Sequence, residues 1–293
     1  MRVDVVIATY NRADTLRETI KNVLTSAYGL TKLYVVDNAS TDHTKAVLES
    51  VADDRLIPVF NKKNLGAAGG KNVGLKMSNA DILVVMDDDA MFASKNPIDE
   101  VIRSFGSDKK LSLIQFKIIN YKEKKVLGHE FPGENPETDS SKSFNIGYFI
   151  GAGHAIRKSV LEIVGYYPDD FGLYAHEEVD LSYRIINHGF TMRYESSIAV
   201  YHRKAPEGRL PSKTVLHNML LNRMIMSRKY LPLHYSIINN FLWILKTLLD
   251  SKSPLAILNV LREFSAKRAS IVPTILSNDA LYYMKKYKGR LFK

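Results

Sequence analysis

Four short apolar runs, each followed by polar residues and then by a helix-like stretch, constrain the fold of this 293-residue chain most strongly. They occupy residues 3–8, 33–36, 56–60 and 82–86 and are rich in valine, isoleucine and leucine. Runs of this length and composition are typical of strands buried on both faces of a sheet. Because parallel strands need crossover connections, their alternation with helices predicts an α/β fold with a mostly parallel central sheet and right-handed crossovers.

Three consecutive aspartates, Asp87, Asp88 and Asp89, close the fourth apolar run. In open α/β sheets, ligands bind at the carboxyl ends of the strands, where these side chains are expected to lie. Three adjacent carboxylates raise one another's pKa unless a cation lies among them. Carboxylate oxygens suit Mg²⁺ or Mn²⁺, so the run predicts a metal site. A solvated acidic turn is the alternative.

Polar residues also follow the other three runs. Thr9 and Arg12 come after the first, Asp37 after the second, and a glycine-rich turn at residues 64–70 precedes Lys71 in the first turn of a helix. A helix N-terminus can bind phosphate through its N–H groups, and an anion there would explain the lysine. Asp37 can accept a hydrogen bond from a pyrimidine imide N–H, or it can simply begin a helix. The glycines do not match GxGxxG or GxxxxGK[ST], which disfavours dinucleotide oxidoreductases and P-loop enzymes.

The middle of the chain contains a long polar stretch, residues 121–143, which predicts a loop or hairpin over the sheet. Two predicted apolar strands, at residues 146–150 and 155–156, flank Gly151 and Gly153, where glycine permits a close approach or a sharp bend. His154 and Arg157 are candidate contacts to a phosphate or sugar group of a ligand.

Glu177, Glu178 and Asp180 begin a predicted helix, where acids are favoured by the helix dipole. A carboxylate there can also remove a proton from an attacking hydroxyl group. His202 follows an apolar run at residues 197–201 and is either a structural histidine or a metal ligand.

Taken in order, the motifs resemble those of the family-two nucleotide-sugar glycosyltransferases of the GT-A fold, particularly the bacterial branch that builds rhamnose-type and related surface polysaccharides. The resemblance covers about residues 3–230. The matching segments are VVIATYNR at 5–12, VVDNASTD at 35–42, NLGAAGGKN at 64–72, VVMDDD at 84–89, FIGAGHAIRKSVLEIVGYYPD at 149–169, YAHEEVDLSYRIINHGF at 174–190 and VYH at 200–202.

The resemblance implies a role for each candidate residue. The implied donor-binding residues are Thr9, Arg12, Asp37, Lys71, Asp87 and Asp88, and the implied ligands of Mg²⁺ or Mn²⁺ are Asp89, Asp87 and His202. Family members usually have Glu-Asp where this chain has Glu177-Glu178. Since the aspartate aligns with Glu178, we expect Glu178 to be the catalytic base, with Glu177 as a second candidate. The additional methylene changes the reach of the carboxylate by about 1 Å.

The expected reaction is metal-dependent transfer, with inversion, of a sugar from a nucleoside-diphosphate donor to a hydroxyl of a glycan or polyprenyl-linked glycolipid. UDP and dTDP donors are favoured, and the expected pathway is bacterial surface polysaccharide synthesis. A sugar nucleotidyltransferase is one alternative, although it should have a glycine-rich loop after the first strand. A non-catalytic carbohydrate- or membrane-binding module is another, and it should lack the metal or base residues.

We expect a catalytic domain at residues 1–205 and a helical extension at residues 206–293, interrupted at Pro232, Pro254 and Pro273. Residues 203–293 contain 17 Lys and Arg against 4 Asp and Glu, a net charge of +13, whereas residues 1–202 carry a net charge of −3. In a glycosyltransferase this basic tail favours an anionic membrane surface over nucleic acid as the partner.

Trp243, the only tryptophan, lies between apolar and basic residues of the tail and is interpreted as a membrane anchor. The alternative is that the tail helices pack on the catalytic domain or on a second subunit in a homo-oligomer. There is no cysteine and no hydrophobic signal-peptide region at the amino terminus. We therefore expect a cytoplasmic protein, peripheral at the inner face of the plasma membrane.

Overall fold

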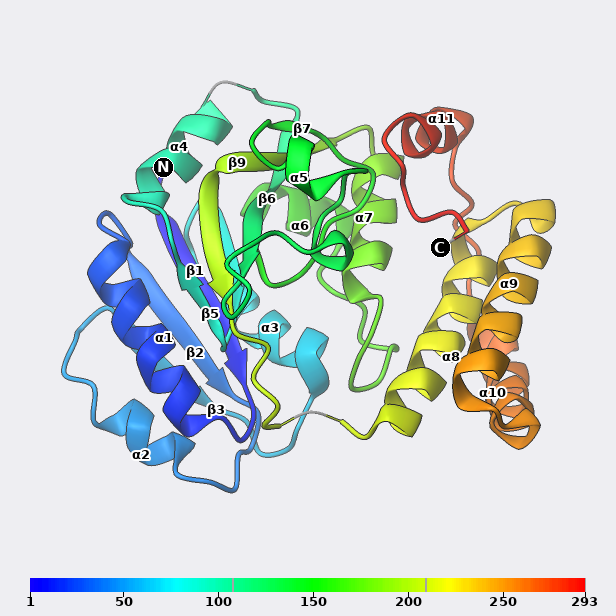
Figure 1. The fold of residues 1–293 in the computed structure, drawn as a ribbon, viewed down its shortest axis with the longest axis horizontal. Coiled ribbons are helices and arrows are strands. Elements are labelled where there is room, and N and C mark those ends of the chain that lie inside the picture. Colours follow the sequence, from blue (N-terminus) through cyan, green and yellow to red (C-terminus); the bar gives the residue numbers. More distant parts are fainter. Residues whose placement is uncertain (107, 209, 293) are drawn as a thin grey trace.

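The computed structural model describes residues 1–106, 108–208 and 210–292, and one mixed sheet with helices on both faces forms its centre (Figure 1). The strands follow the order β3-β2-β1-β4-β8-β6-β9-β5, and the short β7 pairs with β9. The strands are β1 (Val3–Thr9), β2 (Lys32–Asp37), β3 (Leu56–Phe60), β4 (Ile82–Asp87), β5 (Ala90–Phe92), β6 (Leu111–Asn120), β7 (Phe144–Asn145), β8 (Gly153–Arg157) and β9 (Thr191–His202).

The first four strands are parallel, as predicted, and their register brings the polar strand ends together. Thr9 lies opposite Asp37, and Ala8 lies opposite Asp87. The sheet becomes mixed because β8 is antiparallel to both β4 and β6. The alternation of strands and helices thus predicts the parallel half of the sheet, but not the added antiparallel strands.

Helices cover the two faces of the sheet and enclose two hydrophobic clusters. On one face, α1 (Ala13–Ser26) and α4 (Pro97–Gly106) pack through residues such as Leu16 and Phe105, with the short α2 (Thr44–Glu49) at their side. The other face carries α3 (Gly66–Met77), α6 (Lys158–Val164) and α7 (Glu177–Asn187). Two short helical turns, η1 (Gly128–Glu130) and α5 (Pro136–Asp139), lie within the long polar stretch.

The glycine-rich segment is helical from Gly66, so the predicted turn is wrong for residues 66–70. Glycines let α3 approach the sheet: a Cβ at Gly70 would lie 3.0 Å from the Cβ of Ala8, and a Cβ at Gly74, further along α3, would lie 2.6 Å from the side chain of Val6. The first N–H groups of α3 are already bonded, that of Gly66 to Asn64 Oδ1 and that of Ala67 to Leu173 O. These glycines therefore serve close packing, and two of the N–H groups expected to bind phosphate have protein partners.

Residues 146–150 form a buried loop, so the strand predicted there is wrong. Ile146 and Phe149 are only 1% exposed, which explains the apolar pattern. The loop's N–H groups have scattered partners instead of a continuous strand partner: Ile146 N–H donates to the carbonyl of Met192, Ile150 N–H to the side chain of Gln115, and Gly147 N–H to the carbonyl of Tyr287.

The C-terminal part consists of α8 (Ser212–Tyr230), α9 (Leu233–Ser251), α10 (Pro254–Lys267), the turn η2 (Arg268–Ser270) and α11 (Asn278–Lys286). Pro232 and Pro254 stand at the starts of α9 and α10, as predicted. In Figure 1, α11 lies beside α7, whereas α9 and α10 lie outside α8. Residues of α7, α8 and α11 share one hydrophobic cluster. The division at residues 205 and 206 stays a prediction.

Trp243 does not reach the surface, so its interpretation as a membrane anchor is wrong. Its side chain packs inward from α9, with its ring centroid 5.1 Å from that of His176 and the Arg223 guanidinium over its face. Only 7% of the residue is exposed. Within residues 1–106, 108–208 and 210–292, no helix combines the length and apolar character needed to cross a bilayer.

Candidate active site

A cleft of about 870 Å³ opens at the carboxyl ends of the four parallel strands, between the sheet and α8. Stretches of the chain from Ala8 to Arg290 contribute to its wall, including both ends of the predicted catalytic region and the C-terminal helices. The polar lining residues that concern the chemistry are Thr9, Arg12, Lys71, Asp87, Asp88, Asp89, Glu130, Glu177, Glu178, His202, Lys204 and Arg290.

Asp88 is held by the residues that follow β1. Thr9 Oγ1 donates to Asp88 Oδ2 at 2.7 Å, and Arg12 Nη1 lies 2.6 Å from Asp88 Oδ1. Burial raises the pKa of Asp88 to about 6, with Asp89 adding to the rise and Arg12 opposing it. Arg12 also donates to the carbonyls of Ala205 and Glu207, so it joins the aspartates to the segment after β9. The predicted residues Thr9, Arg12 and Asp88 therefore do meet.

Asp37 lies at the end of β2, but it is not among the residues that line the cleft. It is 4% exposed and accepts the Ser40 N–H at 3.0 Å, as a residue that begins a turn does. Its neighbour Asn38 lines the cleft instead. The contact between Asp37 and a pyrimidine base stays a prediction.

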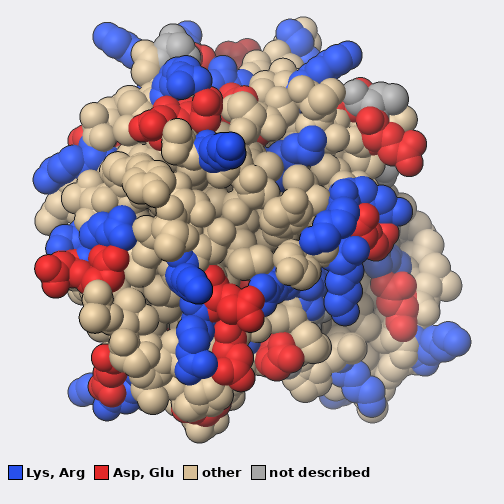
Figure 2. Space-filling view, turned by 60° about the vertical axis from the view of Figure 1, so that its left-hand side comes forward, with Lys and Arg blue, Asp and Glu red and all other residues tan. Residues whose placement is uncertain are grey.

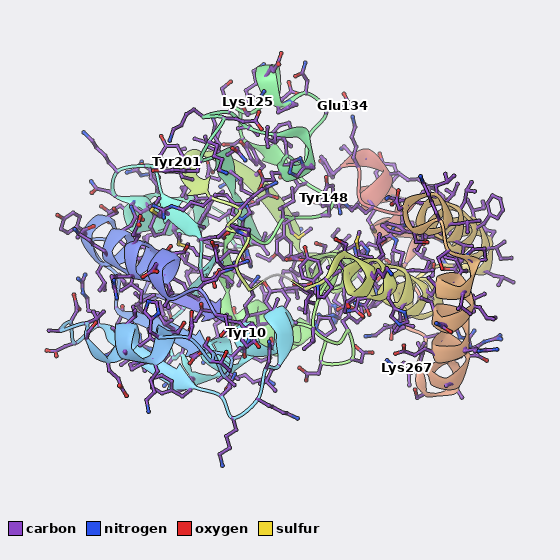
Figure 3. The ribbon with its side chains drawn as sticks, turned by 60° about the horizontal axis from the view of Figure 1, so that its bottom comes forward. Tyr10, Lys125, Glu134, Tyr148, Tyr201 and Lys267 are labelled. Atoms are coloured by element: carbon purple, nitrogen blue, oxygen red, sulfur yellow. The ribbon has the colours of Figure 1, made fainter. Side chains whose placement is uncertain are left out.

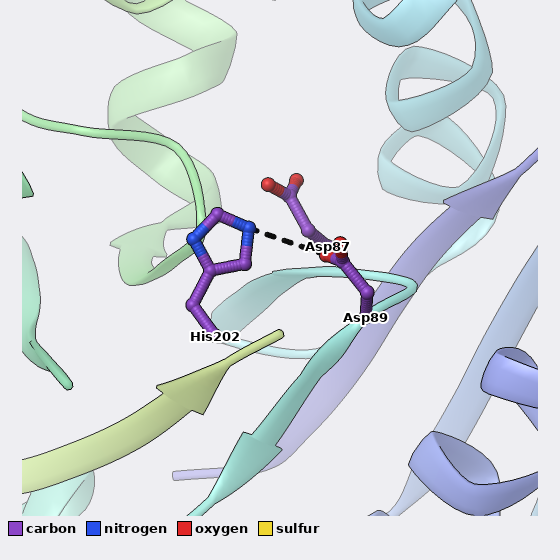
Figure 4. A group of neighbouring side chains, drawn as sticks. All are labelled: Asp87, Asp89 and His202. Carbon is purple, nitrogen blue, oxygen red and sulfur yellow. Dashed lines mark ion pairs between the residues drawn. The ribbon is translucent and has the colours of Figure 1, made fainter. Parts of the chain in front are cut away.

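Asp87, Asp89 and His202 form a group that can hold a metal ion (Figure 4). One ligand atom of each lies within 4.8 Å of the others. Asp89 Oδ1 is buried and has no hydrogen-bond partner among the described residues, although His202 Nε2 lies 3.3 Å from it. Asp89 Oδ2 accepts the Ala205 N–H at 2.7 Å, which fixes the carboxylate. Two carboxylates and an imidazole fit Mn²⁺ or Mg²⁺.

Glu130 supports His202 from the opposite side, and no sequence pattern distinguishes it within the polar stretch. Its Oε1 lies 2.5 Å from His202 Nδ1 and 3.4 Å from Lys204 Nζ. Burial lowers the pKa of His202, but Asp89 and Glu130 outweigh it and raise that pKa to about 10. A carboxylate bonded to one ring nitrogen orients a histidine so that its other nitrogen can bind metal.

Lys71 lies in the second turn of α3, not the first, and its ammonium faces Asp87. Lys71 Nζ is 3.2 Å from Asp87 Oδ1, and the lysine is 4% exposed. Burial raises the pKa of Asp87, but Lys71 and His202 reverse the effect and bring it down to about 2. Burial also opposes the charge on Lys71, yet Asp87 and Glu178 keep its pKa above the usual range. In this structure the lysine neutralises one of the aspartates.

Glu177 and Glu178 begin α7, as predicted, and both line the cleft. Burial raises the pKa of Glu178 to about 8, and the adjacent Glu177 adds to that rise. Burial also raises the pKa of Glu177. Asp180 has a structural role, because it is fully buried and bonded to Arg184 and Tyr230.

His154 and Arg157 lie outside the cleft, so their predicted contact with the donor is wrong. His154 is fully buried, and its Nε2 lies 2.7 Å from Tyr167 Oη. Arg157 lies opposite Ile82, at the other end of β4 from Asp87, and donates to the carbonyls of Phe105 and Leu111.

The opposite wall of the cleft is apolar and basic. Val215, Leu216 and Met219 of α8 line it, together with Arg290 from the segment after α11. The Arg290 guanidinium carbon lies 4.2 Å from the ring centroid of Tyr148, whose position is marked in Figure 3. Its carbonyl accepts hydrogen bonds from Tyr183 and Arg223. Across the described part of the chain, no carboxylate forms a salt bridge with Arg290.

Comparison with known sequences gives a consistent result. The family model described as Glycosyl transferase family 2 matches residues 4–165. A Haemophilus influenzae protein described as uncharacterized is 30% identical over 57% of this chain and 92% of its own length. The Escherichia coli UDP-Glc:alpha-D-GlcNAc-diphosphoundecaprenol beta-1,3-glucosyltransferase WfaP is 32% identical over 30% of this chain and 35% of its own. Poly-beta-1,6-N-acetyl-D-glucosamine synthase of Staphylococcus aureus strain MSSA476 is 24% identical over 65% of this chain and 47% of its own length.

Solved structures share the fold. A structure of GalNAc-T7 with UDP, GalNAc and Mn²⁺ superposes with a TM-score of 0.68 at 13% identity, over 98% of this chain and 56% of that one. S. aureus TarS residues 1–349, in complex with UDP-GlcNAc, gives a TM-score of 0.60 at 16% identity, over 90% and 80% of the two chains. These structures are GT-A glycosyltransferases, so the predicted fold is confirmed.

Proposed function

This chain belongs to glycosyl transferase family 2, and we propose that it transfers a sugar from a UDP- or dTDP-sugar to a hydroxyl group with inversion at the anomeric carbon. Family membership sets aside the nucleotidyltransferase and the non-catalytic module. The GalNAc-T7 structure contains UDP, the TarS structure contains UDP-GlcNAc, and WfaP is a UDP-Glc glucosyltransferase, which together support a uridine donor. A mannosyltransferase of similar fold from Pyrobaculum calidifontis is described with GDP-Man and Mn²⁺, so the fold itself accommodates other bases.

One observation carries the proposal: a half-buried carboxylate of raised pKa, Glu178, lines the same cleft as Asp87, Asp89 and His202. In the proposed reaction, Glu178 takes the proton of the acceptor hydroxyl while the acceptor oxygen forms a bond to the anomeric carbon. The bond from that carbon to the diphosphate oxygen breaks, and the nucleoside diphosphate leaves with the electron pair. A single displacement of this kind inverts the anomeric configuration.

Asp89, Asp87 and His202 are the residues that would hold Mg²⁺ or Mn²⁺. When bound there, the ion would neutralise charge that develops on the leaving diphosphate. Arg12 and Lys204 also line the cleft and supply fixed positive charge on that side. Glu130 keeps the His202 ring in place through Nδ1.

The second wall suits an acceptor that is partly apolar and carries an anion. Val215, Leu216 and Met219 provide apolar surface, and Arg290 provides a cation without a carboxylate partner among the described residues. A polyprenyl-diphosphate-linked glycan has both features, whereas a free neutral glycan has neither. The proposed acceptor is therefore a lipid-linked glycan, and the proposed location is the inner face of the plasma membrane, in surface polysaccharide synthesis.

The test is a donor screen on the full-length protein. Calorimetric titration with UDP, dTDP and GDP in the presence of Mn²⁺ should show preferential binding of UDP or dTDP. Release of the matching nucleoside diphosphate from its sugar, in the presence of a lipid-linked acceptor, should then depend on Glu178. Preferential binding of GDP would overturn the proposed donor, and retention of the anomeric configuration in the product would overturn the mechanism.

A further inference from the structure

One half of α9 exposes apolar side chains along its whole length. At about 100° of rotation per residue, these positions all fall within one half of the helix circumference. They are Leu233, Ile237, Ile238, Phe241, Leu242, Leu245, Leu248 and Leu249, and together they are called the α9 apolar face. Four of them, Leu233, Ile237, Phe241 and Leu249, are more than 60% exposed. Large apolar patches of this kind mark interaction surfaces.

The opposite half of α9 is anchored to the protein, so this exposure does not reflect a loose helix. Asn239, Trp243 and Thr247 are buried, and Asn239 Nδ2 donates to the carbonyl of Leu291. The charged residues Lys246 and Asp250 lie outside the apolar half and pair with each other. The α9 apolar face therefore contains no Asp, Glu, Lys or Arg.

The charge around this helix favours an anionic surface as its partner. The segment from residue 203 to 293, which includes α8–α10, has a net charge of +13, and α10 exposes Leu255 and Leu258 beside Arg262. On the sheet side of the molecule seen in Figure 2, basic and acidic side chains are interspersed. Figure 3 shows Lys267 on the tail helices, well to one side of Tyr10 at the end of β1. The excess positive charge is thus carried by the C-terminal segment as a whole, while α9 itself contains one lysine and one aspartate.

Self-association fits these observations less well. Two copies joined through the α9 apolar face would bring two strongly basic segments together, and like charges at an interface oppose association. An anionic bilayer offers apolar depth for leucine and phenylalanine together with phosphate for lysine and arginine, which is the combination that holds amphipathic helices at a membrane.

We propose that the α9 apolar face inserts into the interfacial region of an anionic phospholipid bilayer and holds the enzyme there without crossing it. The C-terminal end of α9 reaches the cleft, because Asp250 is one of the lining residues. A bilayer on this face would therefore lie close to the cleft. The lipid contact itself rests on α9, and only its purpose, access to a lipid-linked acceptor, rests on the proposed function.

The test uses full-length protein and vesicles of phosphatidylcholine, with or without phosphatidylglycerol, in the absence of donor, metal and acceptor. The protein should co-sediment with the anionic vesicles, and raising the salt from about 0.1 M to 1 M should weaken that binding. The combined substitutions Ile237→Gln, Phe241→Gln and Leu249→Gln should reduce partitioning at least about tenfold. Since all three side chains are exposed, the thermal unfolding midpoint should hardly change.

The matched control replaces three exposed apolar residues of the catalytic part, Tyr28→Gln, Met77→Gln and Ile163→Gln, and should partition like the wild type. Trp243 is buried in the anchored half of α9, so its fluorescence emission should not shift when vesicles bind. Equal partitioning of the α9 variant and the wild type would overturn the proposal. A folded wild type that does not bind anionic vesicles at low salt would also overturn it. The same holds if the wild type forms a dimer that does not bind vesicles and the α9 variant is monomeric.

Glu178→Gln separates this proposal from the proposed reaction. That variant should bind vesicles as the wild type does, whether or not Glu178 is the base. Loss of transfer with intact vesicle binding therefore concerns the reaction alone, and loss of vesicle binding by the α9 variant concerns the lipid contact alone.

Discussion

The carboxylate of Glu178 lies directly against the backbone of Gly151: a Cβ placed on Gly151 would be 2.1 Å from Glu178 Oε1. Glycine is thus required at this position by the proposed base, and not by a turn, since Gly151 does not have a positive φ angle. The contact joins the loop before β8 to the first turn of α7. It fixes where the carboxylate can point within the cleft.

Gly151→Ala should therefore displace the Glu178 carboxylate and lower kcat about a hundredfold, because small misplacements of a catalytic group are costly. Nucleotide binding should persist, since the Asp88 carboxylate is held by Thr9 and Arg12 and not by Gly151. Steady-state kinetics and calorimetry with UDP measure the two effects. Gly106→Ala is the matched control, because a Cβ there meets nothing within 4 Å. Unchanged kcat in Gly151→Ala would show that the position of Glu178 is unimportant.

Glu178→Gln should reduce turnover roughly 10²–10⁴-fold while the donor still binds, because the amide has nearly the same shape but accepts a proton poorly. Glu177→Gln is the internal comparison, since Glu177 lines the same cleft one residue earlier. If Glu177→Gln loses activity and Glu178→Gln remains active, the base is Glu177.

The dependence of activity on pH follows from the raised pKa of Glu178. A base must be deprotonated to act, so a pKa of about 8 in the folded protein predicts that kcat rises as the pH increases through that value. Burial, the main cause of the shift, disfavours the charged form. A pH–rate profile at saturating donor measures this limb. If kcat instead rises through the pKa of an ordinary carboxyl group, about 4.3, Glu178 is not the base.

Removal of the metal site should abolish transfer without unfolding the protein. Asp89→Ala, or wild type in EDTA, should lose activity, because the ligand group lies at a strand end in the cleft and not in the core. Thermal unfolding followed by circular dichroism checks that the fold is kept. Full activity in metal-free buffer with EDTA would contradict metal dependence.

Glu130→Gln should weaken metal binding about 10–100-fold, because the amide orients His202 less firmly than the carboxylate does. Titration of Mn²⁺ by calorimetry gives the affinity, and added Mn²⁺ should restore much of the activity. Glu123→Gln, an exposed position in the same polar stretch, is the control. An unchanged Mn²⁺ affinity would limit Glu130 to a structural role.

Arg290→Ala should raise the KM for a lipid-diphosphate-linked acceptor tenfold or more, since a lost charge-assisted hydrogen bond costs about 1.5–3 kcal/mol. The KM for the donor should not change. Lys288→Ala removes an exposed cation that pairs with Glu134 instead, and should have little effect. If an uncharged alkyl-linked acceptor loses as much as the diphosphate-linked one, Arg290 does not recognise the anion.

The sequence by itself determined the four parallel strands and the polar residues at their ends. Each apolar run is local, and parallel pairing places every carboxyl end at one edge, so Thr9, Arg12 and Asp87–Asp89 had to lie near one another. The order of the motifs also identified the GT-A fold and the acidic start of α7. The local sequence pattern was misleading where the reason for a residue lies in tertiary packing. The glycines of residues 66–70 predict a turn, but they belong to α3, which uses glycines to approach the sheet.

Only the tertiary structure decided which distant residues complete the site. Glu130 is 72 residues from His202, and Arg290 comes from the far end of the chain to the cleft that Glu178 also lines. The same holds for Trp243, whose apolar and basic neighbours in sequence suggest a surface, but which α9 turns inward against His176. These contacts form only after long loops close, and their energy depends on burial and on the facing side chain, neither of which is encoded within a local window of sequence.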